Sequence, residues 1–63
     1  MTFRQMLLEY RAKHDLTQTK LGDILGVCTN MVFKYEHGLS KPTAVNRIRF
    51  ERKMKEWEGN ENV

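Results

Sequence analysis

Four polar side chains in the middle of the chain have types and spacing that suit reading a nucleic acid. Asn30 and Lys34 are four residues apart, so they share one face of any helix that spans them. An asparagine amide can make two hydrogen bonds to adenine, and a lysine ammonium can reach guanine or a phosphate. Thr29 could meet a base edge or a thymine methyl group, and Gln18 could bind a phosphate from the start of a helix.

Two short helices joined by a tight turn are needed to present these side chains together. Apolar residues recur at helical spacing here, which predicts one helix over about 17–25 and a second over about 28–37. Gly22 falls where the two helices must cross closely, and Gly26 falls where the turn needs a positive φ. Gly38 is placed to end the second helix.

The second of these helices has two unlike faces. Steps of about 100° per residue put Val32 and Tyr35 on one side, with Met31 at the border. The residues on the opposite side are Asn30, Phe33, Lys34 and His37. The polar members of this set are either base-reading groups or ordinary solvated residues, and the pattern around them favours base reading. Phe33 would be an exposed aromatic ring in the middle of that surface.

A further helix is predicted before this pair. Thr2 and Gln5 form a capping-box pattern at the start of a helix over about 3–14, with Met1 and Met6 as its hydrophobic staple. The stripe expected to face the core consists of Phe3, Leu7 and Tyr10.

The last predicted helix, over about 43–57 and ended by Gly59 and Asn60, carries two apolar stripes that point in nearly opposite directions. Val45 and Ile48 lie on the stripe expected to close the core. The second stripe consists of Phe50, Met54 and Trp57. A straight helix cannot bury both. Either the helix breaks near residue 49 and the second stripe folds back, or that stripe meets another chain, as aromatic and methionine anchors do.

Positive charge is concentrated along this last helix and just before it. The chain has a formal net charge of +3, and the segment 41–55 holds six basic residues and one acidic residue. Such a block favours a polyanion such as DNA. Pairs such as Arg47 with Glu51 would equally make it a solvated helix face. The candidate phosphate contacts in this segment are Lys41, Arg47 and Arg49.

Residues 3–42 resemble the Cro/CI-type helix-turn-helix family, also called the XRE family. The resemblance is carried by Arg11, Leu16-Thr17-Gln18, Leu21-Gly22, Leu25-Gly26-Val27, Val32, Glu36, Gly38 and Pro42. It implies an all-α, lambda-repressor-like DNA-binding domain of four helices, or five if the last one breaks. The domain would span 1–58, with the helix-turn-helix at about 17–37 and a flexible tail at 59–63.

The resemblance also implies roles for individual residues. An ion pair between Arg11 and Glu36 would tie the first helix to the third. The expected base contacts are Gln18, Thr29, Asn30 and Lys34, and the expected contacts near phosphates are Thr17, Ser40 and Lys41. In this reading the chain is a small phage-type regulator of the lysis–lysogeny switch that binds double-stranded DNA, with homodimers pairing two half-sites.

A second function class stays open, because a fold does not fix a function. Small modulator-of-repression proteins of temperate phages share this resemblance and act together with a CI-type repressor. A protein-binding antirepressor would use the apolar candidates Met31, Phe33, Phe50, Met54 and Trp57 as its interface.

Other classes are not expected. Cys28, His14 and His37 have no metal-ligand spacing, and no nucleophile and base stand together, so neither an enzyme nor a cofactor is predicted. A single cysteine allows no internal disulfide. With no signal peptide and no apolar run of about 20 residues, we expect no membrane span and a cytoplasmic location in a bacterial host cell.

Overall fold

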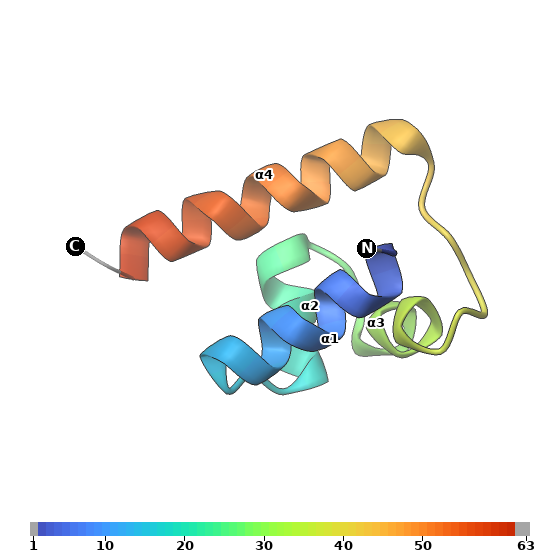
Figure 1. Ribbon diagram of the computed structural model, residues 1–63, viewed down its shortest axis with the longest axis horizontal. Helices are drawn as coiled ribbons and strands as arrows, with labels where there is room; N and C mark the ends of the chain where they lie inside the picture. The colour runs from blue at the N-terminus through green and yellow to red at the C-terminus, as the bar shows by residue number, and fades with distance from the viewer. Residues whose placement is uncertain (1, 62–63) are drawn as a thin grey trace.

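Four α-helices and their connections make up the computed structural model, which describes residues 2–61 (Figure 1). The helices are α1 (Phe3–His14), α2 (Gln18–Leu25), α3 (Thr29–Glu36) and α4 (Ala44–Glu61). No strand occurs within the described range. The first three helices form one group, and α4 crosses that group after an extended connection (Figure 1). The all-α prediction is confirmed, and within residues 2–61 there is no fifth helix.

Side-chain caps fix the starts of the first two helices. The Gln5 backbone N–H donates to Thr2 Oγ1 at 3.1 Å, and the Thr2 backbone N–H donates to Gln5 Oε1 at 3.3 Å, so the predicted capping box is present. Thr17 caps α2 in the same way, accepting from the Lys20 backbone N–H at 3.1 Å. The proposed staple involves Met1, which lies outside the described residues.

Two glycines make the connection between α2 and α3 possible. Gly26 ends α2 with a φ of 79°, in the left-handed region that favours glycine. A Cβ atom on Gly22 would lie 2.7 Å from the backbone oxygen of Val27, so any side chain there would force the turn apart. Both predicted glycine roles are confirmed.

Helix α3 is slightly shorter than predicted. It ends at Glu36 rather than His37, and Gly38, with a φ of 70°, reverses the chain. The Leu39 backbone N–H then donates to the carbonyl oxygen of Lys34 at 2.9 Å, which satisfies a carbonyl group at the helix end. At the other end, Cys28 makes no side-chain capping bond, so α3 starts without this support.

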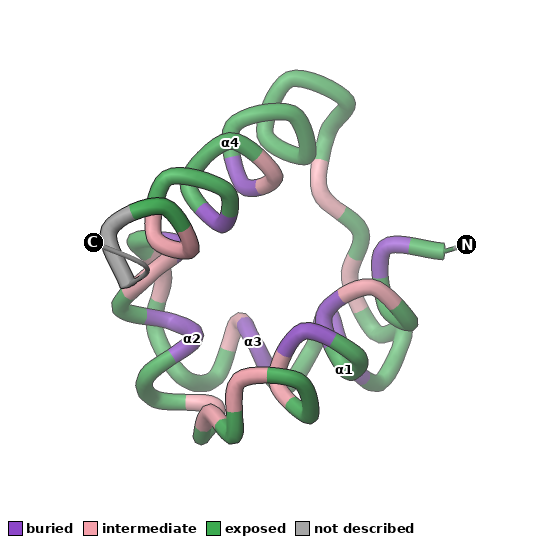
Figure 2. The backbone as a smooth tube through the Cα atoms, turned by 60° about the vertical axis from the view of Figure 1, so that its left-hand side comes forward, coloured by how far each residue is buried: buried purple, intermediate pink, exposed green. Residues whose placement is uncertain are grey.

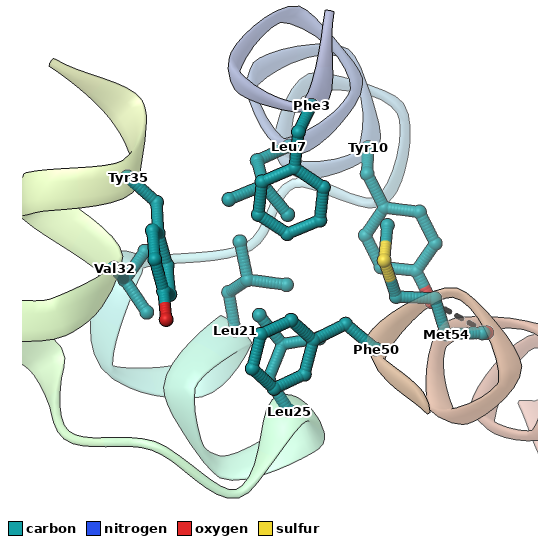
Figure 3. Packing of buried hydrophobic residues seen from close by; sticks show 9 residues of the cluster. All are labelled: Phe3, Leu7, Tyr10, Leu21, Leu25, Val32, Tyr35, Phe50 and Met54. Carbon is teal, nitrogen blue, oxygen red and sulfur yellow. Dashed lines mark hydrogen bonds between the residues drawn. The ribbon is translucent and has the colours of Figure 1, made fainter. Parts of the chain in front are cut away.

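The core lies between α4 and the other three helices, whose buried residues face inward (Figure 2). Leu7, Leu21, Leu25 and Val32 are fully buried in it. Phe3 packs edge-on against Tyr35, with ring centroids 5.6 Å apart, and it lies 6.0 Å from the Phe50 ring (Figure 3). The core cluster consists of Phe3, Leu7, Tyr10, Leu21, Leu25, Val32, Tyr35, Phe50 and Met54.

The orientation of α4 differs from the prediction. The helix is continuous, and it buries Phe50 and Met54, which are 7% and 5% exposed, while Trp57 packs against the same core. Val45 and Ile48 are instead 59% and 58% exposed, so their predicted core role is wrong. The stripe with the larger side chains is the buried one, because it removes more apolar area from water.

This arrangement also corrects the interface prediction. Phe50 and Met54 lie in the core of their own chain and are not available to a partner (Figure 3). Neither predicted alternative holds: the helix does not break to fold the second stripe back, and Phe50 and Met54 belong to the main core of their own chain. Helix α4 also runs through Gly59 to Glu61, so residues 59–61 of the expected flexible tail are helical. Residues 62 and 63 lie outside the described residues.

Candidate nucleic-acid interface

Helix α3 divides into a buried and an exposed face as its sequence predicts. Val32, Tyr35 and Glu36 are buried. The candidate outward residues Asn30, Phe33, Lys34 and His37 are all exposed, as is Thr29 at the helix start. The α2–turn–α3 unit therefore holds a mixed polar and aromatic surface on a helix whose opposite side is fixed in the core.

The starts of α2 and α3 are joined by side chains of the candidate site. The Thr29 hydroxyl lies 3.1 Å from the hydroxyl of Thr19, within hydrogen-bond distance. Gln18 is half-buried, and its amide nitrogen donates to Glu36 Oε1 at 3.0 Å. One of its two amide N–H groups is therefore used inside the chain, and backbone N–H groups at the start of α2, apart from that of Lys20, are further candidate donors to an anion there.

The ion pair expected between Arg11 and Glu36 is present. Arg11 Nε lies 3.2 Å from Glu36 Oε2, and the two side chains are 24% and 2% exposed. The same Nε–H donates to the Leu16 carbonyl oxygen at 3.4 Å. Among the described residues, Glu36 Oε2 therefore has the positive charge of Arg11 beside it but accepts no hydrogen bond. This pair, with Gln18, links α1, α2 and α3 behind the exposed face.

Phe33 and His37 form a stacked aromatic pair on the exposed face. Their ring centroids are 4.0 Å apart at an interplanar angle of 26°, and His37 Nδ1 donates to the Phe33 carbonyl oxygen at 2.9 Å. Phe33 remains 40% exposed. The stacked rings form an aromatic patch in the middle of the exposed face. The helical spacing predicts that Phe33 and His37 both point outward, but it does not predict that their rings stack.

The phosphate-contact candidates after α3 gather at one cleft, with one exception. Ser40, Lys41 and Arg47 line a cleft of about 560 Å³, whereas Arg49 is exposed on α4 outside the cleft lining. Arg4 of α1 lines the same cleft, and the sequence analysis missed it. Nothing in the spacing of residues 4 and 41 signals that they meet, because their proximity depends on how the whole chain folds.

The predicted pair along the solvated side of α4 is also formed, with Arg47 Nε 3.6 Å from Glu51 Oε2. Both side chains are more than 40% exposed, so the interaction is screened by water and weak.

No protein-family model matches this chain, and neither a curated protein nor a solved structure is significantly similar to it. Across residues 2–61, no three His, Cys, Asp or Glu residues gather closely enough to hold a metal ion. No helix in that range has both the length and the apolar character to cross a membrane. Function is therefore inferred from the geometry of the chain's own residues.

Proposed function

We propose that this protein is a small transcriptional regulator that binds operator DNA through a helix-turn-helix formed by α2 and α3. The observation that carries the proposal is the division of α3: its inner face is fixed in the core, and its outer face presents Asn30 and Lys34. A helix with side chains is 10–12 Å across and fits a major groove about 12 Å wide. The residue pattern resembles that of Cro/CI-type regulators.

Each candidate residue has a role in this proposal. Asn30 pairs with adenine, Lys34 reaches guanine or a phosphate, and Thr29 meets a neighbouring base. Gln18 uses one amide N–H on Glu36, and its second amide N–H is the donor it would offer to DNA. The phosphate contacts that fix the protein on the duplex are Thr17, Ser40, Lys41, Arg47 and Arg49.

The burial of Glu36 supports the proposed binding of DNA by the outer face of α3 on electrostatic grounds. On the sequence alone, Glu36 offsets the charge of Lys34 on the same helix. In the fold, Glu36 points into the protein, is 2% exposed and faces Arg11. Lys34 is therefore the charge that α3 presents outward, and the field there favours a polyanion.

Selection from a random pool of duplex DNA, with the protein alone at low salt, tests the proposal. We expect enrichment of one half-site or of a palindrome. Asn30→Ala should relax the preference at one base position, at a cost of about 1–3 kcal/mol against the preferred base. Arg52→Ala, on the exposed side of α4, is the matched control and should leave the preference unchanged. No enrichment by the folded protein would contradict autonomous sequence reading.

The second candidate function is that of an antirepressor which binds the N-terminal domain of a CI-type repressor. The exposed Phe33–His37 stack favours it, since an ordered aromatic patch is typical of protein interfaces. Phe33→Ala should abolish such a complex in analytical ultracentrifugation. Lys34→Ala, one residue away, serves as the exposed control. Equal complex formation by wild type and Phe33→Ala would exclude this role for the patch.

A further inference from the structure

A cleft lies beside the N-terminus of α1, away from the outward residues of α3 that are proposed to read bases. It lies where the start of α1, the end of α3, the connecting segment and the first turn of α4 meet. In Figure 1 the connecting segment, drawn in yellow, bows outward at the side of the molecule where α1 begins. At about 560 Å³ the cleft is in the size range of small-ligand sites.

The charge around this cleft is of one sign. Arg4, Lys41 and Arg47 line it, and no aspartate or glutamate does. Arg47 also pairs with Glu51 at 3.6 Å, and this contact is largely solvent-exposed and easily exchanged. Three cationic residues around one concave surface raise its positive potential above that of scattered surface charges.

The floor of the cleft is apolar and fixed. Phe3 and Tyr35 line the cleft, belong to the core and pack edge-to-face, so the 8% and 6% of their surfaces that remain exposed are held in place. Pro42 adds a further apolar surface, and Ser40 adds a hydroxyl group. A bare inorganic anion would use the cations but leave this floor uncovered. The combination fits an anion attached to a compact carbon ring.

We propose that this cleft binds a phosphate ester. The phosphate oxygens contact Arg4, Lys41 and Arg47, and the sugar or other ring attached to the phosphate lies against Phe3, Tyr35 and Pro42. The N-terminus of α4 adds to the attraction, because Arg47 lies in its first turn and the positive end of the helix dipole points to this side. Two sources supply this chemistry, a free nucleotide and the sugar-phosphate backbone of DNA. Only the second rests on the proposed function.

Titration of the 15N-labelled protein with thymidine 5′-monophosphate and, separately, with inorganic phosphate tests the site by NMR. We expect chemical-shift changes at Phe3, Arg4, Gly38 and Lys41, and tighter binding of the nucleotide than of phosphate. Arg4→Gln and Arg47→Gln should each weaken nucleotide binding about three- to fivefold, as expected for exposed ionic contacts. Arg52→Gln, an exposed arginine of α4 outside the cleft, is the control.

Equal affinity for phosphate and nucleotide, or an equal effect of Arg4→Gln and Arg52→Gln, would overturn the proposal. Arg4 is exposed and makes no contact that holds the core, so its variant should keep the wild-type melting temperature. A melting-temperature check on all three variants separates lost binding from lost folding.

Binding measurements with duplex DNA distinguish a free nucleotide from the DNA backbone as the ligand of the cleft. If the cleft holds the DNA backbone, Arg4→Gln should flatten the slope of log K against log salt by about 0.9 while leaving the base preference unchanged. Nucleotide binding with an unchanged salt slope identifies a free phosphate ester as the ligand. If neither nucleotide binding nor the salt slope depends on Arg4, the site is excluded. Loss of base preference on Asn30→Ala would still support the proposed function.

Discussion

At the scale of the residue, Glu36 shows how the fold removes a negative charge from the exposed face of α3. Its carboxylate lies on the inner side of α3, against Arg11 and the Gln18 amide. Burying a carboxylate is costly unless it is paired, so the three residues depend on one another. The result is an outer face whose one firm charge is that of Lys34.

Replacing Arg11 tests this dependence. Arg11→Met should destabilise the fold by about 2 kcal/mol, less than for a fully buried pair because Arg11 is partly exposed and Gln18 still donates to Glu36. Urea unfolding at pH 7 measures the loss. The double variant Arg11→Met/Glu36→Gln should recover most of it, because a neutral amide needs no counter-charge. If the double variant loses as much free energy of unfolding as Arg11→Met and Glu36→Gln lose in sum, the two side chains are not coupled.

At the scale of the element, α4 has one face in the core and one in water. Phe50 and Met54 reach the other three helices, and the Tyr10 hydroxyl donates to the Met54 carbonyl oxygen at 2.9 Å. Lys53 donates to the Leu25 carbonyl oxygen at 3.2 Å, near Gly26. In contrast, the first turns of α4 are exposed (Figure 2).

Two alanine substitutions two residues apart check this orientation. Phe50→Ala should cost about 3 kcal/mol because it leaves a cavity in the core. Ile48→Ala should change the stability by less than about 0.5 kcal/mol because the side chain is already 58% exposed. Thermal and urea unfolding measure both variants. Comparable losses for Phe50→Ala and Ile48→Ala would mean that α4 presents a different face to the core.

At the scale of the whole molecule, side chains near the end of α4 contact side chains at the end of α1. Glu58 accepts from His14 at 2.9 Å and has Lys13 at 3.8 Å, and the rings of His14 and Trp57 meet edge-on at 5.1 Å. A chain of 63 residues has a small stability margin, so contacts that join distant segments matter to it.

The contact of Glu58 with His14 and Lys13 should weaken in acid. The hydrogen bond from His14, aided by Lys13, lowers the pKa of Glu58 below the usual glutamate value. A lowered pKa in the folded state means that the contribution is complete above the unfolded-state pKa and is lost as the pH falls through the folded-state pKa. We expect the protection factors of amides at the end of α4, which are corrected for the intrinsic pH dependence of exchange, to fall over that acidic range. Glu58→Gln should remove this pH dependence, and an unaltered profile in that variant would contradict it.

Local physics made much of this protein predictable from its sequence. Thr2, Gln5 and Thr17 cap their helices through neighbours three residues away, and Gly26 supplies a φ that other residues resist. The two faces of α3 follow from a period of 3.6 residues. The Arg11–Glu36 pair came from family resemblance, and its geometry agrees with that expectation.

Tertiary structure alone decided which stripe of α4 is buried and where the cleft lies. Helical periodicity shows that Val45/Ile48 and Phe50/Met54 point apart, but it does not show which side meets the other helices. That choice depends on the length and path of the connection from Gly38 to Thr43 and on the shape of the core it must close. The convergence of Arg4, Lys41 and Arg47 follows from the same path, because contacts between distant segments exist only once the chain has folded.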